Sequence, residues 1–242
     1  MRLITNIDYF GDGDKMHLMG AHLPDCDNFP TLIYFHGGGL YGGDRKECKR
    51  ILELTEKGIA VVSAEYRMFP DNHFPDFLFD AAAAVKYTIS HIKEWGGNGK
   101  VFISGASAGA YITMMLSLNH EYFEHFGIDC KDITGFISES AQQFAHYNVL
   151  ASRGFDSRIE RIDETAPINY VGVGLDIRPT LLIYYTDDME CRPEENRLMY
   201  ASMRRLSEDK SLVSIKELEG THCNPKNHDE LVDTYYSFIL EN

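Results

Sequence analysis

The segment Lys100-Val-Phe-Ile-Ser-Gly-Ala-Ser-Ala-Gly109 decides the fold of this chain. Residues 100–104 form a short apolar run typical of a buried strand. Gly105, Ser107 and Gly109 then fit the pattern Gly-x-Ser-x-Gly, whose small residues permit a very sharp strand-to-helix turn. The following residues have helical spacing, with apolar side chains at Tyr111, Met114, Met115 and Leu118. Because such a turn exposes the serine hydroxyl at a helix N-terminus, the sequence predicts Ser107 as a nucleophile, against the alternative of a glycine-rich turn without chemistry.

Strands and helices alternate on both sides of this turn. Apolar runs bounded by turn residues predict further strands at 16–23, 31–35, 59–66, 133–138, 180–185 and 212–218. Amphipathic repeats predict helices at 76–93, 193–206 and 229–240, and the apolar positions of 48–55 share one helical face. The alternation predicts an α/β fold whose mostly parallel sheet has helices on both faces. No repeat or linker interrupts it, so we expect residues 1–242 to form a single domain.

A glycine cluster, His36-Gly-Gly-Gly39, directly follows the predicted strand 31–35. Acyl transfer needs hydrogen-bond donors that already point at the developing oxyanion, and glycines can turn N–H groups into a pocket without side chains in the way. We predict an oxyanion hole made by the N–H groups of Gly38, Gly39 and Ala108, with Gly37 as a less certain donor. A phosphate-binding loop is the competing interpretation, but no Gly-Lys-Ser/Thr or Rossmann pattern is present. The histidine is interpreted as a structural brace.

A serine hydroxyl needs a base within hydrogen-bond reach. His222 follows the last predicted strand and precedes the last predicted helix, where the chain order Ser…Asp…His places the base. His228 is the nearest rival, but it lies at the opening of that helix and is interpreted as a capping or surface residue.

The acid that orients the histidine should follow the predicted strand 180–185, where Asp187 and Asp188 are adjacent. In the usual arrangement, the acid is the third residue after the one that closes the strand, and a proline that starts a helix follows a few residues later. With Tyr185 closing the strand and Pro193 starting the helix, Asp188 fits this spacing better than Asp187 does. Asp187 stays open as an alternative, and Glu139 is a more distant candidate.

These residues together resemble the α/β-hydrolase superfamily, and within it the hormone-sensitive-lipase-like esterases and the small microbial acetyl and xylan esterases. The matching features are His36–Gly39, Tyr66-Arg-Met-Phe-Pro70, His73-Phe-Pro75, Gly105–Gly109, Asp188 and His222. The resemblance implies an eight-stranded sheet and ester hydrolysis through an acyl-enzyme, without metal or cofactor. It also implies small acyl groups, such as those of acetylated or feruloylated sugars, as substrates. Ala106 and Tyr185 depart from the family pattern. Only 35 residues precede His36, so we expect no N-terminal cap of the kind that many lipase-like relatives have.

Two other functions stay open at this point. An aryl formamidase or a small peptidase would use the same triad and oxyanion hole. A non-catalytic, hormone-receptor-like binding module would share the fold, although such proteins typically lose the serine or the histidine.

The segment 141–178 breaks the alternation of strands and helices and mixes aromatic with charged side chains. Loops above the carboxyl ends of the strands bind ligands in sheets of this kind. We therefore predict a lid over Ser107 that contributes Phe144 and Tyr147 to the substrate site, with an ordinary surface excursion as the alternative.

Composition excludes several classes of partner. The formal net charge of −14 argues against nucleic acid, which is bound through clustered Lys and Arg. No apolar stretch resembles a signal peptide or membrane span, and the five cysteines have no zinc spacing. We expect a cytoplasmic enzyme that binds a small-molecule ester and no metal, and the sequence leaves the oligomeric state open. Asp44 is expected either to cap the following helix or to pair with Arg67, with a direct substrate contact as the alternative, and Asp80 is expected to be structural.

Overall fold

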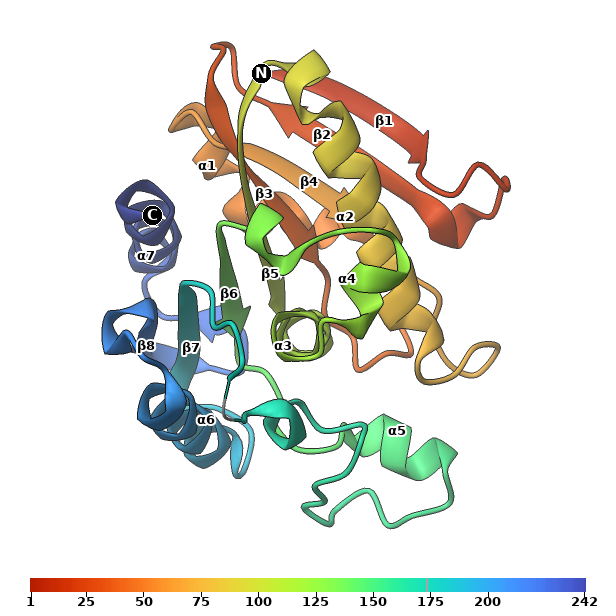
Figure 1. Cartoon of the computed structure of the whole chain (residues 1–242), viewed down its shortest axis with the longest axis vertical. Coiled ribbons are helices and arrows are strands. Elements are labelled where there is room, and N and C mark those ends of the chain that lie inside the picture. Colours follow the sequence, from red (N-terminus) through yellow and green to blue (C-terminus); the bar gives the residue numbers. More distant parts are fainter. Residues whose placement is uncertain (173) are drawn as a thin grey trace.

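The computed structural model describes residues 1–172 and 174–242; residue 173, inside the predicted lid segment 141–178, lies outside the described residues. A nine-stranded sheet forms the centre of the protein, in the order β1-β2-β4-β3-β5-β6-β7-β8-β9. Figure 1 labels the strands β1 to β8. The neighbours from β4 to β8 are parallel, whereas β1, β2 and β9 pair antiparallel. The strands are β1 (Arg2–Asp8), β2 (Leu18–Leu23), β3 (Phe29–Phe35), β4 (Ala60–Ala64), β5 (Gly97–Ala106), β6 (Gly135–Glu139), β7 (Thr180–Asp187), β8 (Val213–Thr221) and β9 (Asn224–Pro225).

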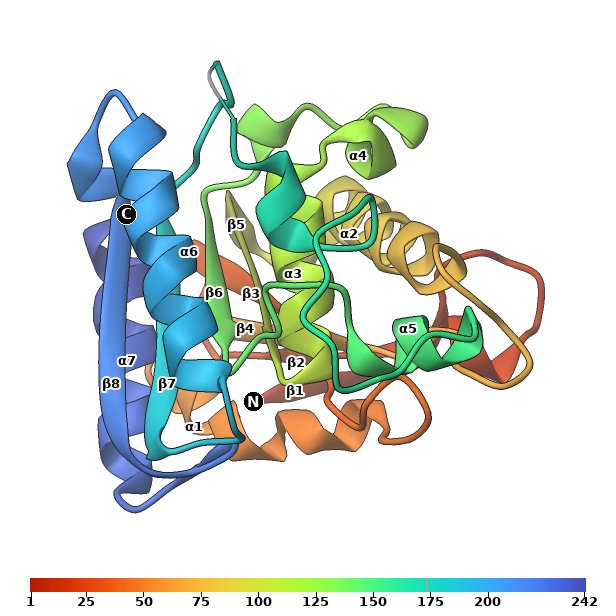
Figure 2. The same ribbon diagram turned by 90° about the horizontal axis from the view of Figure 1, so that it is seen from below.

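Helices cover both faces of the sheet (Figure 2). The α-helices are α1 (Glu53–Glu56), α2 (Asp76–Trp95), α3 (Ala108–Leu118), α4 (Glu121–His125), α5 (Tyr147–Ser152), α6 (Arg192–Leu206) and α7 (His228–Glu241). Short 3₁₀ helices lie at Lys15–His17, Arg45–Ile51, Cys130–Asp132, Pro167–Tyr170 and Lys210–Leu212. No helix in the described part of the chain is both long enough and apolar enough to span a membrane.

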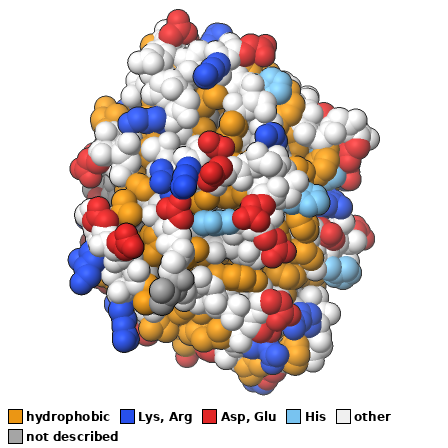
Figure 3. All heavy atoms as spheres, in the orientation of Figure 1, with side chains coloured by type: hydrophobic (Ala, Val, Ile, Leu, Met, Phe, Trp, Pro, Cys, Tyr) orange, Lys and Arg blue, Asp and Glu red, His pale blue; other side chains and the backbone are white. Residues whose placement is uncertain are grey.

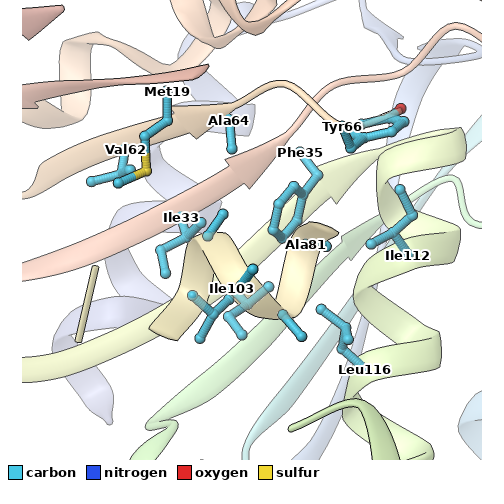
Figure 4. Packing of buried hydrophobic residues seen from close by; sticks show 14 of the residues in the cluster. Met19, Ile33, Phe35, Val62, Ala64, Tyr66, Ala81, Ile103, Ile112 and Leu116 are labelled. Carbon is cyan, nitrogen blue, oxygen red and sulfur yellow. The ribbon is translucent and has the colours of Figure 1, made fainter. Parts of the chain in front are cut away.

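Strand β3 shows how the two layers arise from one sequence pattern. Successive side chains of a strand point to opposite faces. Ile33 and Phe35 therefore join a buried cluster with α2 and α3, whereas Leu32 and Tyr34 join a second cluster with α1 and α7. Figure 4 shows Phe35 and Ile33 between the sheet and the helices that carry Ala81 and Ile112. Burial on both faces explains why the strand reads as a continuous apolar run rather than as an alternating one.

The predicted α/β fold is confirmed, with three local differences. The sheet has nine strands instead of eight, because a two-residue strand, β9, pairs with the end of β8. Helix α2 continues to Trp95 and ends where Gly96 adopts a left-handed conformation, with φ of 102°. The predicted helical face at 48–55 is divided between the 3₁₀ helix Arg45–Ile51 and α1, although Cys48 and Ile51 still pack against the sheet.

Asp44 caps the 3₁₀ helix Arg45–Ile51, because its carboxylate accepts a hydrogen bond from the N–H of Lys46 at 2.6 Å. Arg67 instead pairs with the fully buried Asp80, at 2.7 Å. Of the two roles expected for Asp44, the structure therefore supports capping.

The parallel strands end at one edge of the sheet, so the loops after β3, β5, β6 and β7 meet there. The hairpin between β8 and β9 joins them at the same edge. This edge therefore collects the glycine cluster, Ser107, the adjacent aspartates and His222. On the face seen in Figure 3, Lys and Arg side chains are interspersed with Asp and Glu, so this face has no large area of one charge.

Candidate active site

Ser107 occupies a strained turn between β5 and α3. Its φ of 53° lies in the left-handed region that side-chain-bearing residues rarely adopt. The flanking glycines are required by close packing: a Cβ at Gly105 would lie 2.3 Å from the carbonyl carbon of Gly109, and a Cβ at Gly109 would lie 2.0 Å from the carbonyl oxygen of Phe35. The N–H of Ser107 donates to the carbonyl of Glu139 at 2.8 Å, which fixes the turn to the end of β6. The sequence pattern thus corresponds to a rigid, outward-facing serine.

The structure brings together Ser107, His222 and Asp188. The Oγ of Ser107 lies 2.8 Å from the Nε2 of His222, and the Nδ1 of His222 lies 2.5 Å from Oδ1 of Asp188. These distances are within hydrogen-bond range, so the imidazole can accept a proton from the serine while its other nitrogen donates to the carboxylate.

Asp188 is held by more than the histidine. Its other carboxylate oxygen accepts a hydrogen bond from Ser140 Oγ at 2.6 Å, and Oδ1 also accepts from the N–H of Met189. Burial alone would raise the pKa of Asp188, but the hydrogen bonds from His222 and Ser140 outweigh it and hold the pKa below its usual value. The carboxylate is therefore ionised at neutral pH. Sequence analysis missed Ser140, because only the pairing of β6 with β7 brings it to this place.

The residues considered as alternatives for the acid and the base have other partners. Asp187 is the exposed last residue of β7, paired in the sheet with Thr221. The carboxylate of Glu139 is engaged by Arg50 at 2.7 Å. The ring of His228 lies 3.4 Å from Glu53 on the surface.

The glycine cluster lines the same cavity as Ser107, and the buried side chain of His36 contacts its backbone. His36 is fully buried, stacks on Tyr66 with ring centroids 4.3 Å apart, and contacts the carbonyl of Gly37 through Nδ1. The N–H of Gly37 donates to Glu47 at 3.2 Å, so this group is already engaged. This buried position agrees with the structural role predicted for His36.

Unlike the N–H of Gly37, the N–H groups of the three predicted oxyanion donors are not engaged by a side chain of the described residues. Within residues 1–172 and 174–242, the N–H groups of Gly38 and Gly39 have no protein acceptor. Both residues have positive φ, 102° and 65°, which glycine adopts without strain. Ala108 is the first residue of α3, so no carbonyl within the helix can accept its N–H.

A cavity of about 510 Å³ opens above Ser107. Its wall includes the glycine cluster, His222, Tyr147 and Met189, and the charged side chains of Glu47, Lys49 and Arg50. A somewhat larger hollow between β8 and α7 contains none of the triad residues. The cavity above Ser107 is therefore the one that fits the chemistry.

Of the two predicted substrate-binding residues, only Tyr147 lines this cavity. A Cβ at Gly39 would lie 2.6 Å from the Tyr147 hydroxyl, and Asn148 donates to the carbonyl of Gly39 at 2.5 Å. Phe144 is half-buried and is not part of the cavity wall. Its N–H donates to Glu195 at 3.2 Å, which attaches the backbone of this part of the chain to α6.

The start of α5 is capped by a buried histidine, which makes this region sensitive to acid. The Nδ1 of His146 accepts the N–H of Asn148 at 3.2 Å. Burial, assisted by Arg192, lowers the pKa of His146 from 6.5 to about 3. The folded state therefore binds this proton less readily than the unfolded state, so the free energy of unfolding decreases as pH falls below 6.5.

We expect that lowering the pH from 7 to 5 costs about 2 kcal/mol more in the wild type than in His146→Asn, because 1.5 pH units below 6.5 correspond to about 1.36 kcal/mol each. Asparagine retains a capping oxygen without titrating. Urea unfolding of both proteins at the two pH values measures the difference. Equal losses in both proteins would contradict a neutral, buried His146.

Comparisons with known proteins agree with this architecture. Residues 22–154, more than half of the chain, match the BD-FAE family. Esterase LipI of Mycobacterium tuberculosis is 31% identical over 99 residues, which cover 39% of this chain and 30% of that protein. The chain thus matches only about 30% of the length of this curated relative.

Solved structures share the fold at low identity. A truncated carbohydrate esterase from gut microbiota superposes with a TM-score of 0.79 at 16% identity, covering 99% of this chain and 97% of that one. The propionate-bound thermophilic esterase Est2 of Thermogutta terrifontis has a TM-score of 0.72 at 17% identity, with coverage of 98% and 90%. With the family match over the glycine cluster and the serine turn, these findings show that the chain belongs to the BD-FAE family of α/β-hydrolases.

Proposed function

We propose that this protein is a serine carboxylesterase that hydrolyses small acyl esters, with Ser107 as nucleophile, His222 as base and Asp188 as acid. The observation that carries the proposal is the continuous chain of hydrogen bonds from Ser107 through His222 to Asp188, 2.8 and 2.5 Å long. A partly buried chain of this kind, beside N–H groups of Gly38 and Gly39 that have no acceptor among the described residues, suits acyl transfer.

In the proposed reaction, Ser107 Oγ attacks the ester carbonyl while His222 Nε2 accepts the serine proton. The N–H groups of Gly38, Gly39 and Ala108 donate to the resulting oxyanion. The protonated imidazole, stabilised by the Asp188 carboxylate, then donates its proton to the leaving alkoxide. Water then attacks the acyl-enzyme while His222 Nε2 accepts its proton. The bond between the acyl carbon and Ser107 Oγ breaks, the imidazole returns the proton to Ser107 Oγ, and the carboxylic acid leaves.

We propose acetyl or feruloyl groups on sugars as the substrate class. The family, which is that of bifunctional acetyl xylan/feruloyl esterases, supports this class, and the propionate-bound relative supports short acyl groups. The cavity has the corresponding two characters: Tyr147 and Met189 offer apolar surface, and Glu47 and Lys49 offer hydrogen-bonding groups that suit a sugar.

The decisive experiment is a substrate panel assayed with the wild type and Ser107→Ala. The panel contains nitrophenyl esters of increasing acyl length, acetylated xylo-oligosaccharides, feruloyl esters and N-formylkynurenine. We expect hydrolysis of the sugar esters by the wild type alone, with labelling of Ser107 by a fluorophosphonate probe. Turnover of N-formylkynurenine in place of the esters would indicate the aryl formamidase, and failure of both hydrolysis and labelling would indicate a binding module.

We further propose that the segment containing α5 covers the active site and that Tyr147 contacts the substrate. Tyr147→Ala is expected to change kcat/KM by about 10-fold or more on some esters and much less on others, since it removes contact area from the cavity. The kinetics of this variant on the same panel measure the change.

Phe144→Ala is the matched control, because Phe144 belongs to the same segment but not to the cavity wall. It should lower the melting temperature with little selectivity among esters. If Tyr147→Ala instead reduced activity equally on every ester and lowered the melting temperature as much as Phe144→Ala does, Tyr147 would serve packing alone.

A further inference from the structure

His222 lies at the tip of a hairpin at the edge of the sheet. Thr221, the last residue of β8, pairs with Asn224, the first residue of β9, so His222 and Cys223 form a two-residue connection. Cys223 has a φ of 53°, a conformation that a residue other than glycine adopts only when surrounding contacts hold it. Because β9 is only two residues long, the hairpin itself provides few contacts that could hold this strained tip in place. The position of the His222 imidazole therefore depends on contacts from other parts of the chain.

Arg50 supplies a contact to this tip from a distant part of the chain. Its Nη2 donates to the carbonyl of Cys223 at 2.8 Å, across 173 residues of sequence. The same guanidinium donates two hydrogen bonds to the carboxylate of Glu139, at 3.0 and 2.7 Å. Such forked contacts with a carboxylate fix the orientation of a guanidinium plane, so the donor aimed at Cys223 is fixed as well.

Glu139 connects this contact to the nucleophile. Its main-chain carbonyl accepts the N–H of Ser107 at 2.8 Å, and its side chain holds Arg50. Arg50 itself belongs to the 3₁₀ helix that follows the glycine cluster. One guanidinium therefore joins the segments that carry the predicted oxyanion donors, the nucleophile and the base.

The network is buried and fully hydrogen-bonded at the carboxylate. The side chain of Glu139 is 0% exposed and that of Arg50 is 17% exposed. Tyr185 and Tyr235 donate to the remaining acceptor sites of Glu139, at 2.5 and 3.3 Å. Burial acts to lower the pKa of Arg50, but attraction to Glu139 outweighs it and raises the pKa, so the guanidinium stays charged.

We propose that Arg50 is a positioning residue of the esterase reaction: by holding the Cys223 carbonyl, it keeps the imidazole of His222 within reach of Ser107, and Glu139 orients Arg50 for this task. The proposal rests on the proposed function. Arg50 makes no bond to the reacting atoms and acts through the hairpin tip. Since a misplacement of about 1 Å can cost about 100-fold in rate, loss of this contact should affect the chemical step more than substrate binding.

The main test is Arg50→Lys, which keeps the charge but cannot fork to Glu139 and reach Cys223 together. We expect kcat on a nitrophenyl ester to fall about 10- to 100-fold. KM should stay within about threefold of the wild type, because lysine keeps the positive charge at this place in the cavity wall and the other wall residues are unchanged. The rate of fluorophosphonate labelling should fall by the same factor as kcat. The low-field proton NMR signal of the His222–Asp188 hydrogen bond should broaden as the imidazole becomes less fixed.

Arg67 provides a matched control. It makes the same forked pair with a 0% exposed carboxylate, Asp80, and its side chain is 28% exposed, but it does not line the cavity. Arg67→Lys should lower the melting temperature comparably while leaving kcat close to the wild-type value. If Arg50→Lys does not fold, the double variant Arg50→Gln/Glu139→Gln, which leaves no unpaired buried charge, is compared with Arg67→Gln/Asp80→Asn in the same assays.

Each outcome decides between explanations. A selective loss of kcat and of labelling rate in the Arg50 variants supports the positioning role. Equal losses in the Arg50 and Arg67 variants would show that the pair serves stability only, and a raised KM at unchanged kcat would show that Arg50 binds substrate; either result overturns the proposal. A wild type that neither hydrolyses esters nor reacts with the probe overturns the proposed function, and with it the positioning role.

Discussion

Replacing Ser107 with alanine is expected to lower kcat by roughly 10⁴- to 10⁶-fold, because no other hydroxyl is bonded to His222 Nε2 in the described structure. The fold should be retained, since alanine fits the same turn and the hydrogen bond from the backbone N–H of residue 107 to Glu139 does not involve the side chain. The residual rate would come from substrate binding and the oxyanion hole. Steady-state kinetics, with circular dichroism to verify the fold, measure the effect.

His222→Ala should cost a similar factor, and the double variant should lose little more than either single one, because serine and base act as a unit. Additive losses would contradict the assignment of these two residues to one proton transfer. Retention of more than a few per cent of activity by Ser107→Ala would rule out Ser107 as the nucleophile.

Asp188→Asn is expected to lower kcat by about 10³- to 10⁴-fold, because an amide in this position holds the imidazole in the wrong tautomer. Asp187→Asn is the control: its side chain is exposed at the end of β7, and it should change kcat by no more than about twofold. Kinetics of the two variants at one pH compare them directly. A reversed ranking would move the acid to Asp187 and leave the reaction class unchanged.

The pH dependence of kcat/KM distinguishes the roles of acid and base. The pKa of Asp188 is lowered from 3.8, so its carboxylate is charged at every pH above that value, and its hydrogen bond with His222 is lost only as pH falls below it. A loss of activity on acidification that begins above pH 4 should therefore come from a group other than Asp188. A rise of activity that lies entirely below pH 4 would assign it to a carboxylate instead.

Much of the fold could be predicted because the deciding signals are local. The two glycines around Ser107 reflect clashes between atoms only a few residues apart or on the adjacent strand, so the spacing alone indicates the turn. The apolar repeat of α2 and the apolar run of β3 likewise depend on the periodicity of a single element. The extra strand β9 was missed because a two-residue strand has no periodicity to detect.

The sequence by itself determined the class of the fold, the strained turn at Ser107 and the chain order of the proposed triad. Only the tertiary structure decided which adjacent aspartate faces His222, that Gly37 is already engaged by Glu47, and that Tyr147 rather than Phe144 reaches the cavity. It alone revealed Ser140 and the contact of Arg50 with Cys223, whose partners are 48 and 173 residues apart. The physical reason is that these contacts depend on strand register and on the paths of loops between strands, which no local steric or periodic rule specifies.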